Sequence, residues 1–211
     1  MSDYDRLLEL MRSRRSIRRF SDRAITREDI GRLIEAARWA PSNHNRQPWR
    51  FLVIEDKQQL NELADAVRRG LSGKLRSLPE GAAAYIRELM HYATFFSNAP
   101  VLLLVLHKQP VSVSAPLLAE LKHPELVSGE PLSVAMAVQN LLLAAQALGL
   151  GACVLTGPLL AQDVLDGHLD LPAGHDLTCF VAIGYAAESP PPPRRKSIEQ
   201  IVEFRDTHKP T

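Results

Sequence analysis

Residues 41–49 read Pro-Ser-Asn-His-Asn-Arg-Gln-Pro-Trp, and the rest of the chain is placed around this stretch. The two prolines fix φ and remove two backbone donors, while the serine and amide side chains between them supply donors and acceptors without charge. A rigid loop of this composition suits a neutral, polar, heteroaromatic ligand. An Asx-turn loop whose side chains only hydrogen-bond to their own backbone has the same composition, so that interpretation stays open here.

A helix precedes this loop and a strand follows it. Thr26 is a suitable N-cap with Asp29 three residues later, and apolar residues recur at helical spacing until Pro41 ends the run. Residues 51–54, Phe-Leu-Val-Ile, are all apolar and predict a buried strand.

The rest of the chain predicts more elements of both kinds. Strands are expected at 101–106, 152–156 and 177–185, and helices at 4–11, 57–69, 82–96, 132–150, 159–165 and 197–204. Strands that alternate with helices in this order indicate an α+β or a mixed α/β sandwich. No internal repeat divides the chain, so residues 1–211 are expected to form a single domain.

The overall charge is close to neutral, with 25 basic and 24 acidic residues. No global field therefore attracts nucleic acid or an anionic membrane, and neither is expected as a partner. The N-terminus lacks the basic and apolar regions of a secretory signal, so we expect a cytoplasmic protein.

Cysteines and histidines predict no metal site. Cys153 and Cys179 lie in apolar runs without a C-x-x-C spacing, which indicates buried, inert thiols. His91, His107 and His123 match no ligand spacing and are expected at the surface.

Residues 132–150 form a run of 19 residues without a charge. The run approaches the length of a membrane span, but polar side chains interrupt it and no basic or aromatic anchors flank it. A helix that is apolar nearly all round is expected to be buried on every side, and a chain of this size can hardly cover it alone. The pattern therefore predicts a partner subunit.

Five arginines occur within residues 12–19. Guanidinium groups match phosphate oxygens bidentately, and Ser16 adds a neutral hydroxyl, so an anion site is one interpretation. A solvated patch and a nucleic-acid-binding patch are the alternatives that the run alone leaves open. Far downstream, Gly184 and Tyr185 lead through Pro190–Pro193 into two further arginines.

Taken together, these segments resemble the nitroreductase family of FMN-dependent oxidoreductases. That family opens with R-R-S-x-R-x-F, as in residues 14–20, continues with A-P-S-x-x-N-x-Q-P-W, as in 40–49, and closes with G-Y and a proline-rich basic turn. The resemblance runs from about residue 8 to about residue 204, and its second box is the specific one. It implies an α+β, nitroreductase-like fold: a central mixed, mainly antiparallel sheet flanked by helices, in an intertwined homodimer.

The resemblance also implies which residues bind the cofactor, and it assigns no catalytic protein residue. Contacts to the FMN phosphate, ribityl chain and pyrimidine edge fall to Arg14, Arg15, Ser16 and Arg18, with Arg195 at the phosphate. The loop that contacts the flavin bound mainly by the other subunit comprises Pro41, Ser42, Asn43 and Asn45. The turn whose backbone amide faces flavin N5 corresponds to Leu155, Thr156 and Gly157. Pro193 stands where the family has a second basic residue, so Arg194 is a candidate to compensate.

The chemistry is expected to belong to the cofactor, because the sequence contains no G-x-S-x-G, H-E-x-x-H or phosphate-binding P-loop. The resemblance implies ping-pong reduction of a small acceptor, such as a nitroaromatic or a quinone, with NADH or NADPH as donor. Alternatives are reductive dehalogenation, substrate dehydrogenation and a non-catalytic flavin-binding module. The branch that fragments flavin with oxygen for vitamin B12 biosynthesis has an acidic residue at the position of Ser16, which disfavours that activity.

Two segments are candidates to cover the site. Residues 108–130 contain three prolines, and a long irregular excursion of this kind is typical of a binding lid. Within the less regular segment 70–99, aromatic and methionine side chains could line a substrate cavity or belong to the core: Tyr85, Met90, Phe95 and Phe96.

Overall fold

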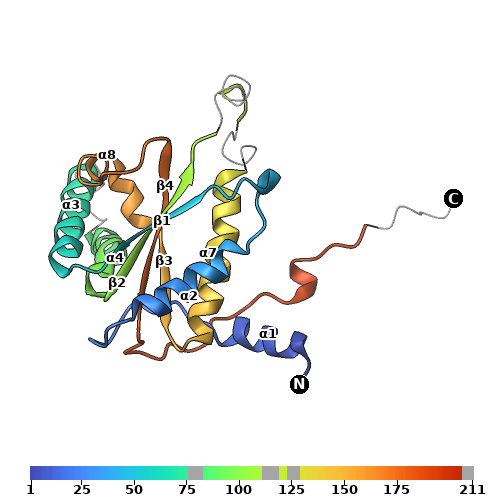
Figure 1. Cartoon of the computed structure of the whole chain (residues 1–211). Coiled ribbons are helices and arrows are strands. Elements are labelled where there is room, and N and C mark those ends of the chain that lie inside the picture. The colour runs from blue at the N-terminus through green and yellow to red at the C-terminus, as the bar shows by residue number, and fades with distance from the viewer. Residues whose placement is uncertain (76–82, 111–118, 123–128, 206–211) are drawn as a thin grey trace.

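The computed structural model describes residues 1–75, 83–110, 119–122 and 129–205. These residues form three layers, with one sheet between two groups of helices (Figure 1). The strands β1 (Trp49–Ile54), β2 (Val101–Lys108), β3 (Gly151–Leu155) and β4 (His175–Gly184) pair in the order β1-β2-β4-β3. All three pairings are antiparallel, and a parallel bridge joins Ser16 to Ala152 beside β3. The predicted α+β fold with a mainly antiparallel sheet is confirmed.

The central strand β2 divides the core in two, because successive side chains of a strand point to opposite faces. Leu103 belongs to the cluster that α2 (Arg27–Arg38) and α7 (Glu130–Ala147) cover. Leu104 belongs to the cluster beneath α3 (Lys57–Leu75), α4 (Ala83–Thr94) and α8 (Gln162–Leu165). Both leucines are almost fully buried, as expected for the apolar run at 101–106 of this strand.

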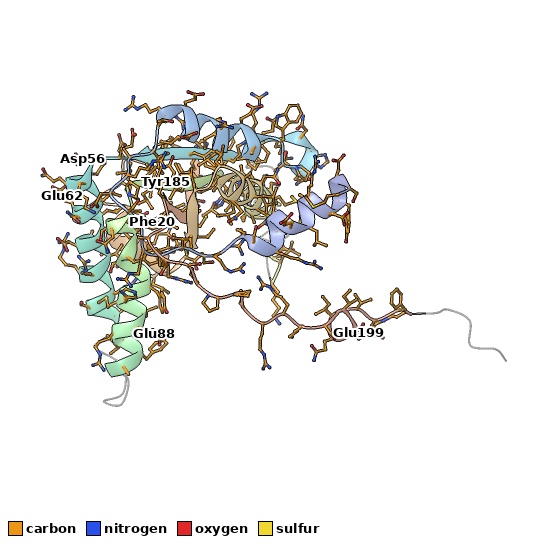
Figure 2. All side chains as sticks on the ribbon, turned by 90° about the horizontal axis from the view of Figure 1, so that it is seen from below. Phe20, Asp56, Glu62, Glu88, Tyr185 and Glu199 are labelled. Carbon is orange, nitrogen blue, oxygen red and sulfur yellow. The ribbon has the colours of Figure 1, made fainter. Side chains whose placement is uncertain are left out.

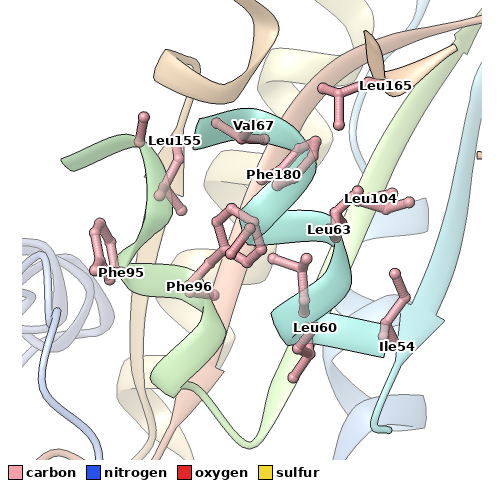
Figure 3. Close-up of a cluster of buried hydrophobic side chains, with 14 of the residues drawn as sticks. Ile54, Leu60, Leu63, Val67, Phe95, Phe96, Leu104, Leu155, Leu165 and Phe180 are labelled. Carbon is pink, nitrogen blue, oxygen red and sulfur yellow. The ribbon is translucent and has the colours of Figure 1, made fainter. Parts of the chain in front are cut away.

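Phenylalanine side chains pack among aliphatic ones in the second cluster (Figure 3). Phe96 and Phe180 meet edge to face, with ring centroids 5.2 Å apart. Phe95 is also buried and Met90 packs against the cluster, whereas Tyr85 is exposed. These residues were expected either to line a substrate cavity or to belong to the core, and the two phenylalanines belong to the core.

Side-chain caps mark the start of α1 and the start of α2. Thr26 Oγ1 accepts a hydrogen bond from the backbone N–H of Asp29 at 3.0 Å, which confirms the predicted start of α2. Ser2 forms a reciprocal capping box with Asp5 at the start of α1 (Asp3–Ser13). No residue of α1 is buried, so this helix lies on the outside of the chain.

Helix α3 continues beyond the predicted end at Arg69 and reaches Leu75, with Gly70 inside it. A Cβ at Gly70 would lie 2.7 Å from the Cβ of Ala161, at the end of the 3₁₀ segment η4 (Gly157–Ala161). The glycine therefore permits close helix packing and does not end the helix.

The predicted final helix at 197–204 is wrong. Only a single 3₁₀ turn, η5 (Ile198–Gln200), forms there, and the segment leaves the body of the chain as an arm (Figures 1 and 2). Ile198, Ile201 and Phe204 are exposed, so no core supports a helix here, and isolated helices this short are marginal in water.

Helix α7 covers one face of the sheet and is not buried on every side. Val134, Ala137 and Leu141 are fully buried, whereas Leu132 and Met136 are 47% and 40% exposed. A single chain therefore does not cover this helix, as predicted, and burial of its exposed side by a partner subunit stays a prediction. Across the described segments, no helix has the length and hydrophobicity that a membrane span requires.

The prediction of a surface position is wrong for one of the three histidines. The His107 side chain is 16% exposed, and its Nδ1 lies 2.9 Å from Thr178 Oγ1. Burial lowers its pKa, and the charges of Asp176 and Glu130 act in the opposite direction. His91 is exposed, and His123 lies outside the described residues, as do much of the predicted lid and residues 76–82.

Candidate functional site

The arginine box, residues 14–20, follows α1 and lies between β3 and the C-terminal segment. The N–H of Ile17 donates to Ala152 O at 3.1 Å, and Phe20 forms an antiparallel bridge to Ala186. The side chain of Ile17 packs directly against Gly151, where a Cβ would meet it at 2.8 Å. The box is therefore fixed to the sheet edge along its length.

An acidic side chain that the sequence analysis missed fixes the backbone of the box. Glu188 Oε1 accepts hydrogen bonds from the backbone N–H groups of Arg18 and Arg19, at 2.6 and 3.1 Å. The Arg15 guanidinium donates to three backbone carbonyls, one of them Pro190 O at 3.2 Å. Arg15 therefore joins the box to the proline segment, which is a structural role. The glutamate follows Gly184-Tyr185 by a few residues, and no local pattern marks it.

Basic side chains of the box and of the C-terminal segment line a hollow of about 320 Å³, here called the arginine hollow. It is lined by Arg14, Arg15, Ser16, Arg18, Pro190, Pro191, Pro193 and Arg195. Among the described residues, the side chains of Arg14 and Arg195 have no ion-pair partner. Arg194 does not line the hollow of the single chain, and its role in place of a basic residue at Pro193 stays a prediction. Unpaired guanidinium groups around a hollow are suited to an anion.

The turn after β3 lies next to the same box. Thr156 is exposed, and Gly157 packs against α4, where a Cβ would lie 3.3 Å from the Cβ of Ala93. The neighbouring Tyr92 is 44% exposed, and the Arg18 guanidinium lies 5.3 Å from its ring centroid, within the range of a cation–π contact. The end of α4 therefore connects the turn to the box.

A buried thiol lies in the strand that precedes this turn. Cys153 is buried in β3, and burial raises its pKa although the positive charge of Arg18 acts in the opposite direction. Burial also raises the pKa of Cys179, to about 12. Both observations confirm the prediction of buried thiols.

The loop at 41–47 carries backbone strain. Three residues that are not glycine have positive φ: His44 at 50°, Asn45 at 51° and Gln47 at 47°. Conformations of this kind cost on the order of 1 kcal/mol or more each and occur preferentially at functional sites. Ser42 Oγ accepts from the Gln47 N–H at 3.0 Å, so part of the loop's polarity serves its own backbone.

The first turn of α7 holds this loop in place. Ser133 Oγ accepts from the N–H of Asn43 at 3.1 Å and donates to Gly129 O at 2.7 Å. Arg46 forms an ion pair with Glu130 at 3.0 Å. No local sequence pattern marks either of these α7 side chains, because the contacts link residues 84 and 90 positions apart.

The predicted site residues therefore form two groups within one chain. The arginine box and Arg195 lie near the start of β3, which follows the C-terminal end of α7, while the loop lies at the N-terminal end of that helix. Because α7 has 18 residues, its ends are about 27 Å apart. The loop residues Asn45 and Gln47 line a separate hollow with Arg38, Trp39 and Ala40.

Comparison with known proteins gives the family. The model of the nitroreductase family matches residues 11–185. An iodotyrosine deiodinase from Thermotoga neapolitana is 29% identical over 94% of this chain and 97% of its own length. A 5,6-dimethylbenzimidazole synthase from Rhodospirillum rubrum is 30% identical over 92% of this chain and 88% of its own. A protein from Archaeoglobus fulgidus, whose name proposes an NADH dehydrogenase or NAD(P)H nitroreductase, is 40% identical over 37% of this chain and 42% of its own.

Solved structures share the fold. A BluB-like flavoprotein from Clostridium difficile superposes with a TM-score of 0.81 at 26% identity, over 95% of this chain and 99% of that one. An oxidized iodotyrosine deiodinase bound to FMN and 3-iodo-L-tyrosine gives a TM-score of 0.69 at 25% identity, with the same coverage of both chains.

Proposed function

Because the chain belongs to the nitroreductase family, we propose that it is an FMN-dependent oxidoreductase that uses NADH or NADPH to reduce a small acceptor such as a nitroaromatic or a quinone. The observation that carries the proposal is the arginine hollow, with unpaired guanidinium groups beside an exposed turn. Arg14 and Arg195 suit the phosphate of FMN, and the backbone of Thr156 and Gly157 suits the reactive edge of the flavin. The flavin, when bound, supplies the electron transfer, and the protein supplies binding and orientation.

The homodimer belongs to this proposal, and it would complete the site. The polar loop and the arginine hollow of one chain lie near opposite ends of α7, a helix about 27 Å long. A second copy placed against the exposed side of α7, with Leu132 and Met136, would bring its loop to the hollow of the first. Twofold symmetry then gives two equivalent shared sites.

The test of the cofactor and the reaction is a purified-protein absorbance spectrum followed by anaerobic titration with NADH and NADPH. Flavin absorbance that bleaches with one of the donors is expected, with parallel double-reciprocal lines in turnover. Folded protein that cannot be reconstituted with FMN would refute the proposal. Bound FMN that neither donor reduces would instead favour a flavin-binding module.

The shared site is tested with mixed dimers. Arg18→Ala damages the hollow and Asn45→Ala damages the loop, so a mixed dimer of the two variants has both lesions in one site and keeps the other intact. About half of the wild-type activity per mixed dimer is expected. Inactive mixed dimers from impaired parents that demonstrably exchange subunits would contradict a shared site.

Reductive dehalogenation is the second candidate, favoured by the iodotyrosine deiodinase relative that aligns with 94% of this chain. Release of iodide from 3-iodotyrosine by the reduced protein supports it. Oxidation of the reduced flavin by nitroaromatics or quinones, without iodide release, supports the first candidate.

A further inference from the structure

Glu130 is a buried carboxylate that is only half satisfied. Its side chain is 4% exposed, and Oε1 accepts a hydrogen bond from Arg46 Nη1 at 3.0 Å. Among the described residues, its other oxygen, Oε2, is inaccessible and has no hydrogen-bond partner. A buried charge without full compensation is destabilising, so global stability alone does not explain this residue.

The position of Glu130 explains how the charge is tolerated. It is the first residue of α7, where the positive end of the helix dipole favours an anion. Its partner Arg46 is 44% exposed and would lose little by turning into water. The ion pair therefore constrains Arg46 more than it stabilises the fold.

Arg46 lies between two residues with positive φ, Asn45 and Gln47. The ion pair holds Arg46 Nη1 at 3.0 Å from Glu130 Oε1, and this restricts the backbone on both sides of Arg46. The same turn of α7 contacts the loop twice more, through Ser133 Oγ and through Gly129, where a Cβ would lie 3.0 Å from Asn43 Nδ2. These contacts converge on the strained loop and not on the core.

We propose that Glu130 is a positioning residue, whose buried carboxylate holds Arg46 and thereby keeps the 43–47 loop in the conformation that contacts the flavin. The inference rests on the proposed FMN binding. On this inference, the unfavourable burial of the Glu130 charge serves to maintain the geometry of the loop.

Glu130→Gln tests the proposal, because the amide keeps the shape and removes the charge. The dissociation constant for FMN should rise about tenfold, since a charge-assisted hydrogen bond that fixes the loop is weakened. Loss of a negative charge would by itself strengthen binding of the FMN phosphate, so weaker binding cannot come from net charge. The melting temperature of the apoprotein should stay unchanged or rise, because a buried charge is removed.

Arg46→Gln removes the same pair from its half-exposed end and should weaken FMN binding to a similar extent. In the double variant, the two substitutions should weaken binding no more than Glu130→Gln does alone. Glu55→Gln is the matched control, because Glu55 forms an exposed ion pair with Arg27 at 3.1 Å, away from the loop. It should leave FMN affinity unchanged.

Wild-type FMN affinity in Glu130→Gln overturns the proposal, as do single effects that add fully in the double variant. If Glu130→Gln does not fold, unchanged affinity in Arg46→Gln overturns it. A wild-type protein that binds no FMN refutes the proposed function instead. The positioning role is then judged by amide hydrogen exchange, where faster exchange at Gln47 in Arg46→Gln supports it and unchanged exchange overturns it.

Discussion

Gly151→Ala should destabilise the chain and weaken FMN binding together. The added Cβ would lie 2.8 Å from each of three side-chain atoms of Ile17: Cβ, Cγ1 and Cγ2. Ile17 is buried, and its N–H donates to Ala152 O at 3.1 Å, so the side chain cannot move away without separating the arginine box from β3.

The expected loss of stability follows from this geometry. Overpacking of a well-packed interior costs about 1 to 3 kcal/mol. At about 3 °C per kcal/mol for a chain of this length, the melting temperature should fall by about 3 to 9 °C. The shifted box should also bind FMN more weakly, because Arg14 and Arg18 move with it.

Thermal unfolding of the apoprotein and FMN titration check both effects. Gly31→Ala is the matched control, since Gly31 lies in α2 and a Cβ there meets no atom within 4 Å. That substitution should raise stability by about 0.5 to 1 kcal/mol, because alanine is the better helix former. In the Gly151→Ala background, Ile17→Ala should lower the free energy of unfolding by less than in the wild type, since two of the three contact atoms disappear. A Gly151→Ala protein as stable as the wild type, with unchanged FMN affinity, would refute the reasoning.

Three further outcomes are expected. Arg195→Ala should weaken FMN binding by about 1.5 to 3 kcal/mol in fluorescence titrations, because a charge-assisted hydrogen bond to phosphate is lost. Thr26→Ala should lower the free energy of unfolding by about 1 kcal/mol in urea titrations, because it removes the N-cap of α2. Burial raises the pKa of the Cys179 thiol to about 12, so the protonated thiol favours the folded state fully below the thiol pKa of the unfolded chain. This contribution to stability is lost as pH rises toward 12. Alkaline unfolding should therefore shift to higher pH in Cys179→Ala.

Local patterns predicted the elements well. Thr26 and Asp29 marked the start of α2 because a cap acts within one turn. The apolar run at 101–106 identified β2 because a strand buried on both faces tolerates no polar side chain. The predicted helix at 197–204 failed because its apolar residues have no surface of their own chain to pack against.

Contacts between distant segments lay beyond such patterns. Glu188 and Glu130 organise the two parts of the candidate site, yet each acts on residues far away in the sequence. The arginine box that the resemblance marked is joined to Ala152 of β3, and the 155–157 turn follows the end of the same strand. The resemblance could not reveal that Arg15 is committed to backbone carbonyls, because only the path of the proline segment decides that.

The two parts of the candidate site differ in how they are held, and the difference bears on how a flavin would bind. None of the residues that line the arginine hollow has a positive φ. The loop keeps three residues at positive φ and relies on a buried, half-satisfied carboxylate. Strain of this kind persists only where surrounding contacts determine it, and here those contacts come from the first turn of α7. Under the proposed homodimer, α7 would also form the subunit contact, so the orientation of the loop toward the flavin would depend on the same helix that joins the two chains.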